Sequence, residues 1–138
     1  MDRRRRLFWH GIFLFSLALL SGVFTQTMTS PRMGLAAHTS GVASGTFLAV
    51  LGALWSELRL GTRADGAAYW LAIYAAYAGW AAVQVGAIFG TSRMTPIAGA
   101  GHTAPAYQEA IVSFGLVTGA AALLLACALL LWGLRGRR

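Results

Sequence analysis

The chain alternates between long apolar stretches and short polar connections. Four stretches are long enough to cross a bilayer, because a hydrocarbon core of about 30 Å needs about 20 residues at a helical rise of about 1.5 Å each. The connections between them are rich in Ser, Thr, Pro, Gly and Arg, which interrupt helices or favour water. The pattern predicts transmembrane helices at about 7–26, 34–58, 67–90 and 105–134.

Small residues within these stretches indicate how the helices pack. Burial of apolar side chains does not drive helix association in lipid, so close backbone contact through small residues takes that role. Gly41 and Gly45 offer one such surface, and the small residues between Ala75 and Ala82 offer another. We therefore expect residues 1–138 to form one all-α domain, an antiparallel four-helix bundle integral to the membrane.

Composition agrees with a bilayer protein and excludes several other classes. Hydrophobic residues make up 57% of the chain and charged residues only 11%, too few to coat a water-soluble domain. The net charge of +7 comes from Arg residues that gather at the two chain ends and in the connection at 59–66. This distribution indicates membrane topology rather than a nucleic-acid-binding face, and it predicts cytoplasmic termini. The single Cys127 lies in an apolar run, where we expect it to pack in the core.

Few polar side chains lie at membrane depth, where they are costly and are functional candidates by default. His10 and His38 fall near opposite ends of the first two predicted helices, about 20 Å apart in depth, so they cannot bind one metal within a subunit. This separation excludes an ordinary bis-histidine electron-transfer heme. The remaining candidates are Gln84, Glu109 and, in the preceding loop, His102.

His38 lies beside a strip of glycines. At 100° per residue, it shares one helix face with Gly41, Gly45 and Gly52. Two interpretations remain open for this face. The glycines can form a seam against another helix, with a hydrogen-bonded imidazole between the helices, or they can leave a flat surface for a planar macrocycle that the imidazole holds.

Several polar residues should lie at one level near the end of the bundle opposite the termini. His38, His102, Tyr107 and Glu109 all fall there, and Gln84 can join them from the third helix. Glu109 follows Pro105 in the first turns of the last helix. It can complement the helix dipole or take part in proton transfer.

An aromatic and polar stripe runs along the third predicted helix. Trp70, Tyr74, Tyr77 and Gln84 recur near one face, where they can belong to the core or wall a site for an aromatic ligand. No motif of a soluble enzyme is present: the sequence has no GxSxG, HExxH or Walker loop. A small membrane exporter is a rival interpretation, although the first helix lacks the carboxylate typical of such antiporters.

Seven segments, in their order and spacing, resemble the hydroxylaminobenzene mutase family, and the resemblance covers essentially the whole chain. More distantly, the chain is similar to styrene oxide isomerases, four-helix membrane enzymes that form trimers and hold heme b through one axial His. The segments are His10-Gly11, Pro31 to His38 with Gly41 and Gly45, Ala78 to Ala82, Met94 to Ala98, Gly101 to Thr103, Tyr107 to Ala110, and Leu131 to Arg135.

The resemblance implies an isomerase that converts an aryl hydroxylamine to a 2-aminophenol by intramolecular hydroxyl transfer. It further implies a homotrimer in the bacterial inner membrane, with ferric heme b as a Lewis acid. An epoxide isomerase of the styrene oxide type is the alternative. On this basis the predicted site residues are His38 as the heme ligand with Gly41 and Gly45 beside the cofactor, Glu109, His102 and Gln84 as catalytic residues, and Trp80, Tyr77, Ser44 and Tyr107 at the substrate.

Substrate handling does not carry over from the isomerase branch. Styrene oxide isomerases have Asn at the positions of Ser44 and Ala82 and a substrate-contacting Tyr at the position of Gly86. The chain therefore lacks the side chains that the isomerases have at these three positions, including the tyrosine that contacts their substrate.

Overall fold

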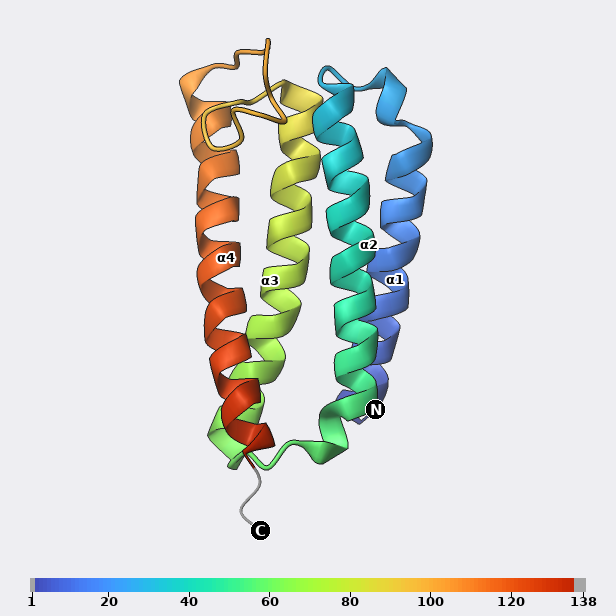
Figure 1. The fold of residues 1–138 in the computed structure, drawn as a ribbon, viewed down its shortest axis with the longest axis vertical. Helices are drawn as coiled ribbons and strands as arrows, with labels where there is room; N and C mark the ends of the chain where they lie inside the picture. Colours follow the sequence, from blue (N-terminus) through green and yellow to red (C-terminus); the bar gives the residue numbers. More distant parts are fainter. Residues whose placement is uncertain (1, 136–138) are drawn as a thin grey trace.

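The computed structural model describes residues 2–135 and, within them, places four long helices (Figure 1). All four helices are long and apolar enough to cross a membrane, and they confirm the predicted all-α, four-helix membrane fold. Arg137 and Arg138, two of the Arg residues behind the predicted topology, lie outside the described residues. The helices are α1 (Arg3–Val23), α2 (Pro31–Leu54), α3 (Thr62–Phe89) and α4 (Ala106–Leu134), with the short 3-10 turns η1 (Thr25–Thr27) and η2 (Trp55–Glu57) after α1 and α2.

Three helices begin earlier than their apolar stretches predict, at residues 3, 31 and 62 instead of 7, 34 and 67, and α1 ends three residues earlier. Apolar length sets the span of a helix in the bilayer, whereas local backbone chemistry sets its ends. The Ser30 side chain accepts a hydrogen bond from the Met33 N–H at 3.4 Å, and Pro31 occupies the first helical position. A glycine ends α3: Gly90 lies just after the helix and has a backbone in the left-handed region, with φ of 72°.

The helices run in a row rather than in a closed square (Figure 1). The closest pairs are α1 with α2 and α3 with α4, and the two pairs join along α2 and α3. α4 has no comparable contact with α1 or α2 in the described part of the chain. Long apolar side chains such as Phe114 and Leu124 are therefore exposed on the surface of the single chain, as a protein surrounded by lipid or by further copies requires.

Glycines make both helix pairs possible. A Cβ on Gly45 would lie 2.7 Å from the Gly11 carbonyl oxygen and 2.7 Å from the Phe15 nitrogen, both in the α1 backbone. A Cβ on Gly119 of α4 would lie 3.1 Å from the nitrogen of Gly79 in α3. The predicted small-residue interfaces are thereby confirmed.

The start of α1 and the end of α4 lie at the same end of the molecule (Figure 1). Arg3 forms an ion pair with Asp65 of α3, and the backbone N–H of Arg59 donates to the Gly133 carbonyl at 3.0 Å. The first contact ties the start of α1 to the first turn of α3, and the second ties the α2–α3 connection to the end of α4. The long α3–α4 connection, residues 90–105, covers the opposite end.

Candidate functional site

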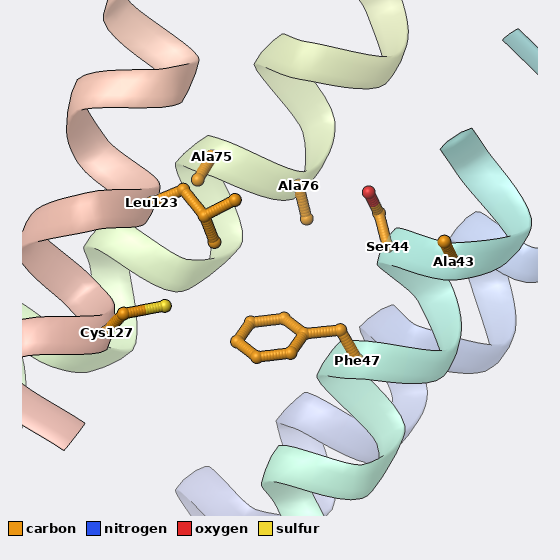
Figure 2. A pocket seen from close by; sticks show the side chains of 7 residues that line it. All are labelled: Ala43, Ser44, Phe47, Ala75, Ala76, Leu123 and Cys127. Carbon is orange, nitrogen blue, oxygen red and sulfur yellow. The ribbon is translucent and has the colours of Figure 1, made fainter. Parts of the chain in front are cut away.

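An apolar cavity of about 350 Å³ opens between α2, α3 and α4, near the middle of the helices (Figure 2). Two alanines on α3, both buried and with small side chains, form part of its wall. The volume lies at the lower end of the range for small-molecule sites, about 300–1,000 Å³, and therefore suits a small ligand. The lining residues are Ala43, Ser44, Phe47, Ala75, Ala76, Leu123 and Cys127.

Ser44 supplies the one hydroxyl group among these lining residues. Its side chain extends from α2 toward Ala76 on the facing helix (Figure 2). Most other helical hydroxyls in the chain bond to a carbonyl one turn earlier, as Thr46 does to Val42 at 2.8 Å, but the Ser44 hydroxyl has no such partner within residues 2–135. A ligand in the cavity can thus hydrogen-bond to it. Cys127 lies at the cavity wall on α4, where it is half-buried rather than enclosed in the core.

His38 is fixed by a backbone contact with α1. Its Nδ1 lies 2.8 Å from the Ala18 carbonyl oxygen, and its ring fills the space above Gly22, where a Cβ would lie 2.5 Å from Nδ1. A carbonyl only accepts, so Nδ1 carries a proton, and in the neutral ring the free lone pair is on Nε2. This is the arrangement in which a histidine ligates a metal, with the second nitrogen oriented by a carbonyl.

The chain supplies no complete set of metal ligands. Within residues 2–135, no group of three or more His, Cys, Asp or Glu side chains comes together to hold a metal ion. A metal bound to His38 Nε2 would need its remaining ligands from elsewhere, as a macrocycle provides. The chemistry of His38 therefore fits a residue that would hold such a group through one nitrogen.

The glycine strip beside His38 is a packing seam. A Cβ on Gly41 would lie 2.6 Å from Ala18 Cβ and against the Trp80 ring, and Gly45 faces the α1 backbone. The structure thus favours the first of the two interpretations given above. The predicted role of Gly41 and Gly45 beside a cofactor requires a surface that α1 and Trp80 cover.

His38 and Ser44 belong to different faces of α2. They are six residues apart, which separates them by about 120° around the helix axis. His38 contacts α1, whereas Ser44 faces α3 and α4. The imidazole and the apolar cavity consequently do not converge within one chain.

The carboxylate of Glu109 clamps the α3–α4 connection. Its Oε1 accepts from the Ser92 N–H at 2.9 Å and its Oε2 from the Arg93 N–H at 3.1 Å, and the side chain is only 5% exposed. Both oxygens are therefore engaged by backbone donors, a contact across the loop rather than a cap on α4 itself. Its predicted catalytic role is untested and would require release of one of these bonds.

His102 packs against the end of α3. A Cβ on Gly90 would lie 3.5 Å from the His102 Cβ, and the His102 Nδ1 is buried without a hydrogen-bond partner in the described residues. This imidazole keeps an unengaged nitrogen, unlike the Glu109 carboxylate. Its predicted catalytic role stays a prediction.

The aromatic and polar stripe of α3, together with Trp80, contacts three neighbouring helices. The Tyr77 hydroxyl lies 3.1 Å from His10 Nδ1 on α1, and the Trp80 ring packs against Gly41 with its Nε1 buried and unpartnered within residues 2–135. Tyr74 instead reaches α4, with its hydroxyl 2.7 Å from Thr118 Oγ1. The stripe therefore does not form one wall of a shared aromatic site.

The remaining predicted residues lie apart from the apolar cavity. Tyr107 is 64% exposed at the start of α4, and Gln84 Nε2 donates to Met28 Sδ at 3.6 Å near the end of α1. Of the four residues predicted at the substrate, only Ser44 lines the apolar cavity. Sequence reasoning missed Phe47 and Leu123 as lining residues and placed Cys127 in the core, because apolar residues in a membrane helix look the same whether they face lipid, protein or a cavity.

Comparison with known proteins shows which family this chain belongs to. Residues 3–135 match the family model described as styrene oxide isomerase. The chain is 46% identical to hydroxylaminobenzene mutase HabB of Ectopseudomonas oleovorans over 132 residues, which cover 95% of this chain and 80% of that protein. It is 36% identical to hydroxylaminobenzene mutase HabA of the same organism over 129 residues, covering 93% and 96% of the two chains. No solved structure gives a significant match.

Proposed function

This chain belongs to the styrene oxide isomerase family and is an isomerase, and we propose that its reaction converts an aryl hydroxylamine to the corresponding 2-aminophenol. The observation that carries the proposal is the 46% identity to a hydroxylaminobenzene mutase across 95% of the chain. The reaction moves a hydroxyl oxygen from nitrogen to the ortho carbon of the ring without net oxidation or reduction. A proton leaves that carbon as the ring becomes aromatic again, and the nitrogen gains one proton to become the amino group, so that substrate and product are isomers.

The apolar cavity suits the central requirement of this reaction. In water, acid cleaves the N–O bond and solvent adds mainly to the para carbon, so an ortho product requires a site from which water is excluded. Phe47, Leu123 and the alanines of α3 supply such walls. The Ser44 hydroxyl is the group that can hydrogen-bond to the N-hydroxyl oxygen and orient the ring.

We propose further that the protein binds heme b through His38 Nε2, with Nδ1 held by the Ala18 carbonyl. When bound, the ferric iron supplies a Lewis acid that weakens the N–O bond. His38 contributes the ligand nitrogen, the Ala18 carbonyl orients the ring through Nδ1, and Gly22 leaves room for it. Gly41 and Gly45 act indirectly, because they bring α1 close enough for its carbonyl to reach His38.

Assembly and topology form the last part of the proposal. His38 and the Ser44 cavity lie on different faces of α2, and in a homotrimer one copy can supply the imidazole and another the cavity. The Arg residues at the end shared by α1 and α4 support cytoplasmic termini in the inner membrane.

Turnover by the purified protein in detergent tests the proposed reaction. We expect phenylhydroxylamine to yield 2-aminophenol, and we expect Ser44→Ala to lower kcat/KM about fivefold to tenfold, the size of one lost neutral hydrogen bond. Ser16→Ala is the matched control, because its hydroxyl bonds to the Ile12 carbonyl on the exposed surface of α1. Absence of 2-aminophenol would overturn the proposal. Conversion of styrene oxide instead would establish epoxide isomerisation, the second candidate, which the matched family model favours.

An absorption spectrum tests the cofactor separately. The wild-type protein should show a heme Soret band, which His38→Ala should lose or shift. His10→Ala is the control, since its ring contacts Tyr77 at the other end of the bundle. Identical spectra for the wild type and His38→Ala would contradict the assignment of the ligand.

A further inference from the structure

A second cavity, of about 400 Å³, lies at the end of the molecule opposite the termini. It is open on one side and lined by the last turn of α1, the α1–α2 connection and the second half of α3, and it shares no lining residue with the Ser44 cavity. Its lining residues are Ser21, Phe24, Thr27, Met28, Thr29, Gln84 and Ile88.

Two polar atoms in this lining lack partners. The Ser21 side chain is 9% exposed, and its hydroxyl oxygen is buried without a hydrogen bond within residues 2–135. The Gln84 Oε1 is also buried without a partner there, while its Nε2 meets only Met28 Sδ at 3.6 Å. A thioether is a weak acceptor, so the Gln84 NH2 group remains available to a stronger acceptor, and Oε1 remains available to a donor.

The other hydroxyls of the lining are already satisfied. Thr27 donates to the Phe24 carbonyl and Thr29 to the Ile88 carbonyl, each at 2.7 Å. Ser21 differs, because its hydroxyl makes no such bond to a backbone carbonyl. Buried polar groups left unpaired are costly, so two of them on side chains that line one cavity point to a polar ligand group as their partner.

The walls define the rest of the ligand. Phe24, Met28 and Ile88 present apolar surface of the kind that contacts an aromatic ring, and none of the lining residues carries a charge. A neutral single-ring aromatic molecule fits this environment. Its head group must both donate and accept hydrogen bonds, in order to satisfy the Ser21 hydroxyl and the Gln84 amide.

We infer that this cavity is a second binding site, one that holds a neutral aromatic molecule with an N–H and an O–H group next to each other. The identity of the ligand rests on the proposed function: aryl hydroxylamines and 2-aminophenols both carry such a head. The position near the end of α1 and α3 suits capture of substrate or release of product at the membrane surface. The site is thus distinct from the cavity in which the reaction takes place.

Binding of 2-aminophenol to the purified full-length protein tests this inference, because the product binds without turning over. Equilibrium dialysis should show binding to the wild type, and Ser21→Ala should weaken it about fivefold, as the loss of one neutral hydrogen bond does. Ser113→Ala is a matched control, since that hydroxyl is also buried and unpartnered in the described chain but lines neither cavity. Toluene, which lacks a polar head, should bind equally to the wild type and to Ser21→Ala.

Three outcomes separate this site from the proposed reaction. Equal affinity of the wild type and Ser21→Ala for 2-aminophenol would overturn the site and indicate that water alone fills it. Binding that depends on Ser21, without turnover of phenylhydroxylamine, would support the site and overturn the reaction. Turnover without any dependence of binding on Ser21 would support the reaction and overturn the site.

Discussion

Replacement of Glu109 by Gln separates a structural role of this carboxylate from a catalytic one. In the wild type, each carboxylate oxygen accepts one backbone N–H of the α3–α4 connection, at 2.9 Å and 3.1 Å. The amide of Gln keeps one acceptor and turns an NH₂ group toward the other donor, so one of the two bonds is lost. A hydrogen bond to a charged group contributes about 1.5–3 kcal/mol.

From this value we expect the free energy of unfolding to fall by about 2 kcal/mol in Glu109→Gln. If the loss is local, opening of the connection becomes about thirtyfold more frequent, since each 1.4 kcal/mol corresponds to about a factor of ten. Hydrogen exchange at the amides of Ser92 and Arg93, followed by mass spectrometry, measures this opening directly. Thermal unfolding in detergent gives the global effect.

Glu57→Gln serves as the control for loss of one acidic charge, because Glu57 is exposed at the opposite end of the molecule. It should leave exchange at the α3–α4 connection unchanged. Suppose instead that Glu109→Gln exchanges and unfolds like the wild type while turnover falls tenfold or more. A structural role of Glu109 in holding the α3–α4 connection would then be refuted, and the carboxylate would act on the substrate.

Two pairs of glycine substitutions test the packing and the backbone. Gly45→Ala should destabilise the protein by about 1–3 kcal/mol, because its Cβ would overlap the α1 backbone at 2.7 Å. Gly79→Ala, whose Cβ meets nothing within 4 Å, should be neutral or stabilising in the same thermal unfolding assay. Gly90 and Gly101 both have a positive φ, and an alanine at either position would have to adopt it at a cost of about 1–2 kcal/mol. Gly90→Ala should unfold at the lower temperature, because its Cβ would also lie 3.0 Å from Thr29, and equal stability would contradict the packing described at that end.

The membrane spans were predictable because one physical length governs them. Any stretch of about 20 apolar residues crosses the hydrocarbon core, and four such stretches became α1 to α4. The helix ends were less predictable, since Arg3 and Thr62 continue helices beyond the apolar limits. Backbone hydrogen bonding does not stop where the hydrocarbon ends.

The glycine face of α2 was ambiguous for a clear reason. A helix seam and a planar ligand require the same feature, a strip without side chains, so Gly41 and Gly45 alone cannot distinguish them. Only the position of α1 resolved the question, with Ala18 against Gly41 and Phe15 against Gly45.

Several site contacts left no signal in the sequence because their partners are backbone atoms. Ala18 holds His38 through its carbonyl, and Ser92 and Arg93 hold Glu109 through their N–H groups, roles that any residue type can fill. The unpaired Ser21 hydroxyl was equally invisible, since a serine in a helix usually bonds within its own turn. Such contacts depend on how the helices are placed relative to one another.

An isotope measurement tests most directly the claim that the oxygen moves within a dry cavity. Phenylhydroxylamine labelled with oxygen-18 at the hydroxyl group is converted in ordinary water, and the 2-aminophenol is analysed by mass spectrometry. Unlabelled substrate in oxygen-18 water serves as the reciprocal control. We predict full retention of the label in the first experiment and none acquired in the second; a product that carries solvent oxygen would contradict intramolecular transfer.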